Sequence, residues 1–298
     1  MDIVMLGHSA AGKTTYISLM YAAMNRGIGG FSVHANQYGH HASLINAADA
    51  IVRQRRYPDP SDQRSVFDFV LRHHGEDVFP FRWRDYRGGA LRERSTSPQA
   101  AQLHEDLKTC GGIVVFCDSY RLWHEPGAAR DVRQLVSHIQ RALDARGESV
   151  TPLVIAFTKA DLVDIDNDEV IARIAEPFVP LIEAVAQTEH IMGTAIPVAC
   201  GPGPVNVEVP VLWCLRFGII GRAMQLQKSI EEKIAAAEYA AQRDTLTDRF
   251  FSWLNDEPSW NSIGQGHLRD AQAEYELFEP LVEPANQLGE VLDGVSGF

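Results

Sequence analysis

The amino-acid sequence predicts an α/β fold with buried parallel strands. Short apolar runs, typical of strands that are buried on both faces, recur through the first two thirds of the chain. Segments with apolar residues at helical spacing separate most of these runs. A chain of 298 residues, 45% of them hydrophobic, is long enough to bury a full α/β core and to carry additional elements.

The expected strands are of two kinds. Continuous apolar runs indicate strands inside the sheet. Residues 65–73 and 78–85 instead alternate between apolar and polar side chains around a turn at Gly75, which favours an antiparallel hairpin. The expected strands are residues 2–6, 31–34, 65–73, 78–85, 112–117, 152–157 and 195–199.

Helical spacing of apolar residues, together with helix start and stop signals, predicts the helices. The longest, residues 210–241, has Pro210 in its first turn, where proline is tolerated. A helix near residues 268–278 is expected before Pro280 and Pro284. The other expected helices are residues 13–25, 40–56, 98–109, 126–146, 168–175 and 177–189.

A glycine-rich loop joins the first strand to the first helix. Residues 7–14 read Gly-His-Ser-Ala-Ala-Gly-Lys-Thr and fit the pattern G-x-x-x-x-G-K-[ST] at every fixed position. Such a loop curls so that backbone N–H groups wrap a phosphate chain, while Lys13 neutralises the terminal phosphates and Thr14 ligates Mg²⁺. An accidental glycine loop is a poor alternative, because the match is complete and stands between a strand and a helix. The expected nucleotide contacts in this loop are Gly7, Ser9, Ala10, Ala11, Gly12, Lys13, Thr14 and Thr15.

The second strand of the predicted hairpin ends at Asp85, and Gly88 follows three residues later. In a phosphate-binding protein of this type, such an aspartate orients water on Mg²⁺ and the glycine N–H meets the γ-phosphate. The pattern D-x-x-G is weak alone, but here it follows a strand in the expected place.

A second strong motif, Thr158-Lys159-Ala160-Asp161, stands at the end of a buried strand and fits [NT]-K-x-D. The Asp161 carboxylate can accept from both N1–H and the 2-amino group of guanine, an arrangement that adenine lacks. The Lys159 stem is expected to cover the base. A weaker signal is the loop at Cys200, whose backbone N–H groups are expected near the guanine O6.

The amino-acid composition bears on the class of binding partner and on the cellular compartment. The net charge of −12 argues against nucleic acid as the main partner, and residues 256–298 alone hold nine acidic residues and one basic residue. The 4 cysteines lack metal-site spacing and indicate a reducing compartment, so we expect a cytoplasmic location. We expect no signal peptide, transmembrane helix or lipid anchor.

With these three motifs in order, each at a strand end, residues 1 to about 228 resemble the G domain of Ras-like small GTPases, and look closest to divergent bacterial G domains such as the double-GTPase families. The resemblance implies a mixed six-stranded sheet with one antiparallel strand and helices on both faces. It implies that Lys13 and Thr14 hold phosphate and Mg²⁺, that Asp85 and Gly88 serve the γ-phosphate end, and that residues 158–161 bind the base. We expect a G domain over residues 1–243 and an acidic helical extension over residues 244–298.

Three departures from the small-GTPase pattern are visible. The helix at residues 40–56 is an apparent insertion. The first switch loop offers no threonine to Mg²⁺; Ser61 is the best substitute, with simple turn capping as an equal alternative. Gly89 stands where a water-orienting glutamine is usual, so we expect slow hydrolysis, with Arg87 as a candidate arginine finger supplied by the same chain.

The motifs therefore predict a GTP-hydrolysing switch that uses Mg²⁺ and acts on an effector or regulatory protein. A scaffold that binds GTP without hydrolysing it is the main alternative. An ATPase or kinase fits less well, because Asp161 indicates guanine and the strand before Asp85 carries two arginines.

Overall fold

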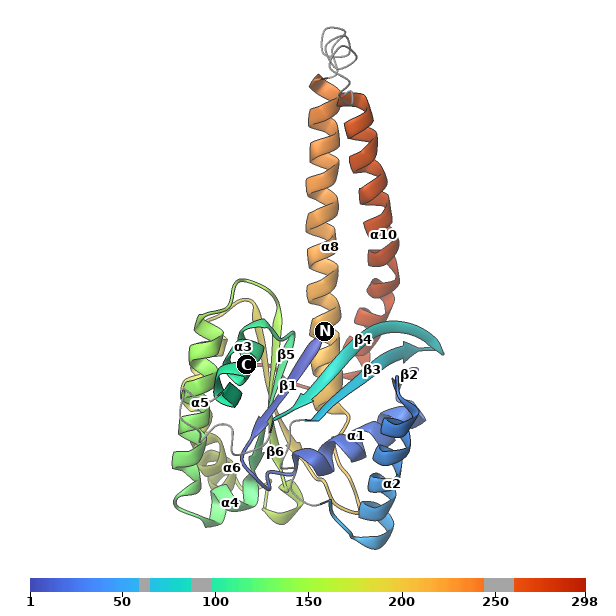
Figure 1. Ribbon diagram of the computed structural model, residues 1–298. Coiled ribbons are helices and arrows are strands. Elements are labelled where there is room, and N and C mark those ends of the chain that lie inside the picture. The colour runs from blue at the N-terminus through green and yellow to red at the C-terminus, as the bar shows by residue number, and fades with distance from the viewer. Residues whose placement is uncertain (59–64, 87–97, 244–259) are drawn as a thin grey trace. The chain divides into compact units, whose positions relative to one another are not determined.

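The computed structural model describes residues 1–58, 65–86, 98–243 and 260–298 (Figure 1). The chain divides into two compact units, residues 1–218 with 287–298, and residues 219–286. The first unit contains the sheet and its covering helices. The second contains most of two long helices, α8 (Val209–Arg243) and α10 (Trp260–Val291). The division falls within both helices, whereas the sequence placed a boundary after residue 243.

The first unit is built on a sheet of seven strands in the order β2-β3-β4-β1-β5-β6-β7. Among the described strands only β3 runs against the others, so the prediction of a mixed, mostly parallel sheet is confirmed. The sheet has one strand more than the six that the family resemblance implied, because the strand expected at residues 31–34, β2, pairs with β3 and forms an edge. The strands are β1 (Asp2–Gly7), β2 (Phe31–Ala35), β3 (Ser65–His73), β4 (Glu76–Asp85), β5 (Gly112–Asp118), β6 (Thr151–Thr158) and β7 (Ile191–Val198).

The predicted hairpin is present as β3 and β4, with Ser65 opposite Asp85 and His73 opposite Glu76. Its alternation places Phe79, Phe81 and Trp83 in the core. Because β4 continues parallel to β1, Asp85 lies beside Met5, just before the glycine-rich loop. The hairpin thus brings the second motif to the first.

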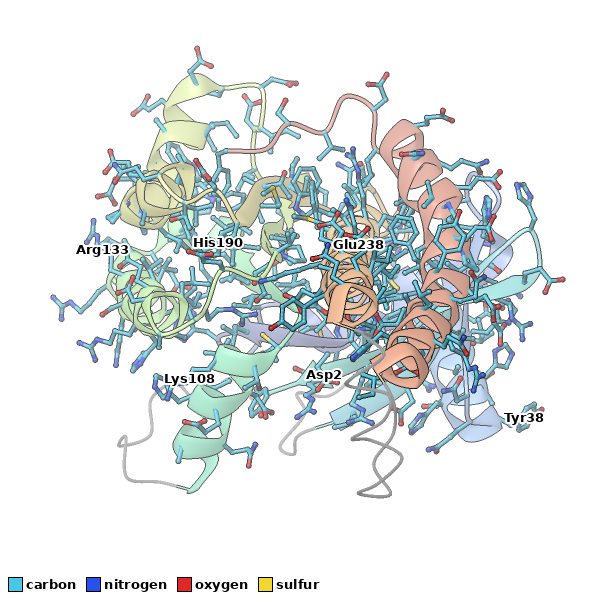
Figure 2. All side chains as sticks on the ribbon, turned by 90° about the horizontal axis from the view of Figure 1, so that it is seen from above. Asp2, Tyr38, Lys108, Arg133, His190 and Glu238 are labelled. Atoms are coloured by element: carbon cyan, nitrogen blue, oxygen red, sulfur yellow. The ribbon has the colours of Figure 1, made fainter. Side chains whose placement is uncertain are left out.

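Helices cover both faces of the sheet, as expected. On one face, α3 (Pro98–Thr109), α5 (Ala128–Asp144), α6 (Asp168–Ala175) and α7 (Val179–Ala186) pack on β1, β5 and β6 in one apolar cluster. On the other face lies α1 (Lys13–Arg26), whose Tyr16 ring contacts Trp83 and Phe116. Helix α2 (Tyr38–Gln54), the apparent insertion, packs on α1. Side chains on the outer surfaces, such as Tyr38, Lys108 and Arg133, point away from this core (Figure 2).

Several boundaries differ from the sequence prediction. The helix expected at residues 126–146 is present as α5, and a short helix that was not expected, α4 (Ser119–His124), precedes it. The helix expected at residues 177–189 is a short 3₁₀ turn followed by α7. Strand β7 begins at Ile191, earlier than expected, because the whole of β6 pairs with it.

The prediction of a short C-terminal helix is wrong, because α10 continues through Pro280 and Pro284. A proline inside a helix removes one N–H donor and clashes with the preceding turn, so prolines usually mark helix ends. Here packing outweighs that cost: Leu281 and Leu288 are 6% and 0% exposed.

By length and composition alone, residues 209–242 of α8 would be long and apolar enough to cross a membrane, but half of the most apolar window is buried inside the protein. Val211, Leu212 and Leu215 at its start belong to the buried core. The first turns of α8 are therefore buried in the way that is typical of a core helix.

Candidate nucleotide-binding site

A cavity of about 580 Å³ opens where the strands end. Most of its lining lies at or just after the carboxyl ends of β1, β4, β5, β6 and β7, the edge at which open α/β sheets bind ligands, and Tyr57 and Pro58 follow α2. The sequence motifs, far apart in the chain, meet there. The lining residues are Ser9, Ala10, Ala11, Gly12, Lys13, Thr14, Thr15, Tyr57, Pro58, Asp85, Tyr86, Tyr120, Thr158, Lys159, Asp161, Leu162, Cys200 and Gly201.

Both glycines of the loop are required by its geometry. Gly7 has φ 148°, and a Cβ there would lie 2.6 Å from the Phe116 carbonyl oxygen. Gly12 has φ 84° and precedes α1, so no side chain caps the helix. The N–H groups of the first helical turn are therefore available to an anion, and the helix dipole favours negative charge there.

The Lys13 side chain folds back along the loop and donates to the carbonyl oxygens of Gly7 at 2.9 Å and His8 at 3.3 Å. Burial lowers the pKa of Lys13, and the nearby Asp85 acts in the opposite direction. A cation held here by carbonyl groups is placed to exchange those contacts for phosphate oxygens.

Asp85 is 3% exposed, and within the described residues its Oδ1 atom has no hydrogen-bond partner. Burial raises the pKa of Asp85 to about 6, although Lys13 opposes that shift. A buried carboxylate oxygen without a partner is costly unless a cation or ligand satisfies it. Together with Thr14 on the same cavity wall, Asp85 offers the hard oxygen ligands that suit Mg²⁺.

At the end of the cavity where the sequence predicts the base, Thr158 contacts two neighbouring segments. Its Oγ1 lies 2.9 Å from the Ala11 carbonyl oxygen and 3.1 Å from that of Cys117, so its hydroxyl can donate to either one. Lys159 has φ 57°, and its Nζ lies 2.5 Å from the Asp118 carboxylate at the end of β5. These contacts fix the motif on its neighbours, while Asp161 faces the cavity.

The loop after β7 closes the base end, with mutual backbone hydrogen bonds of 3.1 Å between Ala199 and Val205. Cys200 lines the cavity, and burial followed by the charge of Asp161 raises the pKa of its thiol to about 12. The thiol is therefore neutral at physiological pH. A Cβ on Gly201 would lie 3.6 Å from Asp161 Oδ2 and 3.9 Å from the Tyr57 hydroxyl.

Sequence reasoning missed several lining residues, notably Tyr57, Tyr86 and Tyr120. Tyr86 occupies a variable position of D-x-x-G, and Tyr57 precedes Pro58 in the segment from which only Ser61 was singled out. The place of Tyr86 beside Asp85 was an available signal, whereas Tyr57 and Tyr120 stand beside none of the three motifs and gave none. The expected Ser61, Arg87, Gly88 and Gly89 lie outside the described residues.

The fold and the cavity define a P-loop protein of the GTPase class, with a divergent G domain. The family model of Double-GTPase 2 matches residues 3–191, more than half of the chain. The protein therefore belongs to the Double-GTPase 2 family.

Among solved structures, three small GTPases are similar in shape. The signal recognition particle receptor SRb from Chaetomium thermophilum, in an SRb-GTP/SRX complex, has a TM-score of 0.42 at 13% identity, covering 72% of this chain and 96% of the other. The Arl6 BBS3 GTPase from Trypanosoma brucei, bound to GppNp, has 0.40 at 14%, covering 74% and 98%. A Sar1 GTPase from Encephalitozoon cuniculi, bound to GDP, has 0.37 at 12%, covering 73% and 79%. No curated protein sequence matches the chain.

Proposed function

We propose that this protein is a guanine-nucleotide switch that binds GTP and Mg²⁺, hydrolyses GTP slowly and thereby regulates a partner protein. The observation that carries the proposal is the meeting of the three motifs in one cavity of about 580 Å³. Family membership supports guanine-nucleotide binding.

The phosphate end would be served by the glycine-rich loop. Its N–H groups and Lys13 bind and orient the phosphate chain and stabilise the charge that spreads over the transferred phosphoryl group. Thr14 and Asp85 would hold Mg²⁺, which when bound neutralises charge on the phosphates. Ser61 and Gly88 stay proposed contacts at this end.

Guanine selectivity would come from Asp161. Its carboxylate accepts from two donors that guanine has and adenine lacks, so with ATP it would stay unpaired. We expect Asp161→Ala to weaken GTP and GDP binding by on the order of 2–4 kcal/mol, or roughly 30-fold to 1,000-fold in Kd.

Titration calorimetry with GTP, GDP and ATP in the presence of Mg²⁺ tests this selectivity. Asp166→Ala is the matched control, because Asp166 is exposed and lies outside the cavity lining. Equal affinity of the native protein for ATP and GTP would exclude the proposed function.

Hydrolysis separates the switch from a scaffold that only binds GTP. Gly89 has no side chain to orient water, so we propose slow turnover with Arg87 or a partner supplying the missing group, an effect of roughly 10³- to 10⁵-fold. Single-turnover assays should show slow hydrolysis, slower still in Arg87→Ala, and faster in Gly89→Gln. Complete absence of turnover, with or without cell extract, would favour the scaffold.

We further propose a cytoplasmic protein with an effector or regulatory protein as its partner. The reduced cysteines and the net charge of −12 support this setting and disfavour nucleic acid.

A further inference from the structure

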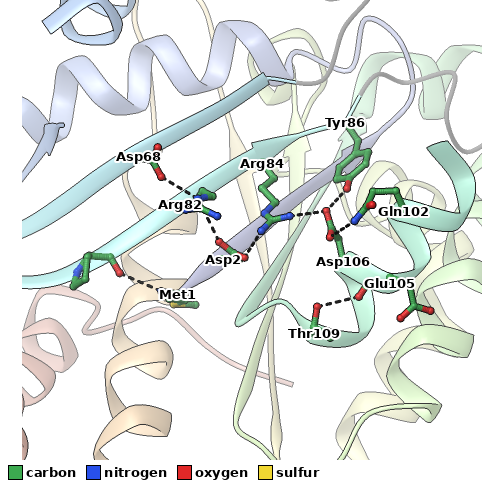
Figure 3. Close-up of polar contacts among 11 residues, drawn as sticks. Met1, Asp2, Asp68, Arg82, Arg84, Tyr86, Gln102, Glu105, Asp106 and Thr109 are labelled. Carbon is green, nitrogen blue, oxygen red and sulfur yellow. Dashed lines mark hydrogen bonds and ion pairs between the residues drawn. The ribbon is translucent and has the colours of Figure 1, made fainter. Parts of the chain in front are cut away.

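A polar network connects the residue after Asp85 to helix α3 (Figure 3). The Tyr86 hydroxyl donates to Oδ2 of Asp106, and Arg84 Nη1 donates to the same oxygen at 2.8 Å. Gln102 Nε2 donates to the other oxygen, Oδ1, at 2.9 Å. Among the described residues the Asp106 carboxylate thus receives three side-chain donors, and one of them, Tyr86, lines the cavity.

The network also reaches the first strand. Arg84 Nη2 donates to Asp2 Oδ2 at 2.5 Å, so one guanidinium joins β1, β4 and α3. The side chains of Arg84 and Asp106 are 16% and 9% exposed, which limits screening by water. Burial alone would raise the pKa of Asp106, but the hydrogen bonds from Tyr86, Gln102 and Arg84 outweigh it and lower the pKa. The carboxylate is therefore ionised and its donors are held firmly.

Tyr86 is fixed at both ends of its side chain. It is 5% exposed, and its ring belongs to the apolar cluster that contains Leu103 and Leu107 of α3. Its hydroxyl is tied to Asp106 of the same helix. A residue so constrained sets the backbone direction at the end of β4.

Asp85 depends on that backbone for its orientation. Its Oδ1 has no hydrogen-bond partner among the described residues, so no side-chain bond at that atom aims the carboxylate into the cavity. The peptide groups on either side of Asp85 therefore help to set its position, and the next residue is Tyr86.

We propose that the contact of Tyr86 with Asp106 is a positioning latch, which holds Asp85 at the phosphate end of the cavity and couples that end to α3. The inference rests on the proposed function, because it assigns a role at the γ-phosphate and Mg²⁺ end. Tyr86 and Asp106 act through Asp85 and are positioning residues.

Tyr86→Phe tests the latch, since it keeps the ring and removes only the hydroxyl. The readout is the Kd for GDP and for the GTP analogue GppNHp, each with Mg²⁺ and with EDTA. We expect GppNHp binding in Mg²⁺ to weaken by about fivefold or more, the lower range of coupling between sites. GDP binding in EDTA should change by less than about twofold, as for a surface substitution.

Two further variants support the interpretation. Gln102→Ala removes one donor to Asp106 from an exposed position on α3. It should therefore shift the ratio of the Kd for GppNHp to the Kd for GDP in the same direction as Tyr86→Phe, but by less. Tyr38→Phe, which removes a hydroxyl from a side chain that is 84% exposed, should leave the ratio unchanged.

The outcomes separate the latch from the proposed function. If the native protein prefers guanine nucleotides but Tyr86→Phe and Gln102→Ala keep its GppNHp-to-GDP ratio, the latch is wrong and the proposed function stands. Equal weakening of both nucleotides would show a general structural role and also overturn the latch. If the native protein binds neither nucleotide, both inferences fail.

Discussion

Asp85 shows the energetic cost of building the site, because its charged form is buried. Its carboxyl group is buried at the cavity wall, and its pKa is raised to about 6 from 3.8. Between these two pH values the folded state binds more protons at Asp85 than the unfolded state does. The free energy of unfolding therefore falls as the pH rises from about 4 to 6. Above pH 6 the protein carries a buried negative charge at Asp85, which a bound cation would neutralise.

We therefore expect Asp85→Asn to stabilise the nucleotide-free protein at pH 7, by on the order of 1–3 kcal/mol, because the buried charge disappears. The same change should weaken binding of Mg²⁺–GTP, since it removes the carboxylate that we propose as a metal ligand. Thermal unfolding at several values between pH 4 and pH 7 measures the first effect and titration calorimetry the second. If the stability of the variant depended on pH as that of the native protein does, the raised pKa of Asp85 would be refuted.

Single residues also show how much of the site was predictable. Lys13, Thr14 and Asp161 were identified because their motifs demand fixed types at fixed spacing, and all three line the cavity. The network of Tyr86 with Asp106 was not predictable, because a side-chain contact between residues 20 positions apart leaves no local pattern. The fixed types of a motif are visible in one sequence, whereas the groups that support them are not.

At the scale of elements, the sequence predicted best where burial and local signals agree. Residues 112–117 of β5 and 152–157 of β6 are apolar, since both faces of these strands are covered, and α3 and α6 have the predicted bounds. Helix α10 was misjudged because Pro280 and Pro284 are local stop signals that long-range packing overrides. Helix α4 was missed because its 6 residues are too few to show helical periodicity, and the Asp118 side chain that caps it also ends a strand.

The prolines of α10 give a test at this scale. Pro280 is exposed and cannot donate to the carbonyl group of Glu276. Pro280→Ala restores that donor without removing core volume, so we expect a gain of on the order of 1–3 kcal/mol in stability. Circular dichroism at 222 nm followed through thermal unfolding measures the gain. A lower melting temperature would show that the helix needs the proline.

At the scale of the whole molecule, the hydropathy of α8 would allow it to span a membrane, whereas the net charge opposes binding to an anionic membrane. Residues 209–242 are apolar enough to span a bilayer, yet the chain carries −12 overall, and residues 256–298 hold nine acidic residues against one basic residue. Half of the apolar window of α8 is already buried by the protein itself. Half of the hydrophobic window that would drive insertion is therefore already removed from water, and the net charge opposes approach to an anionic surface.

We accordingly expect the full-length protein to show no binding to anionic phospholipid vesicles or to duplex DNA, even at low ionic strength, where screening is weakest. Co-sedimentation with vesicles and a DNA mobility assay, each repeated from low to physiological salt, measure this. Binding that weakens as salt is added would reveal a basic surface that the net charge conceals. Binding that is insensitive to salt would instead show that α8 leaves the core and inserts, which would overturn its interpretation as a core helix.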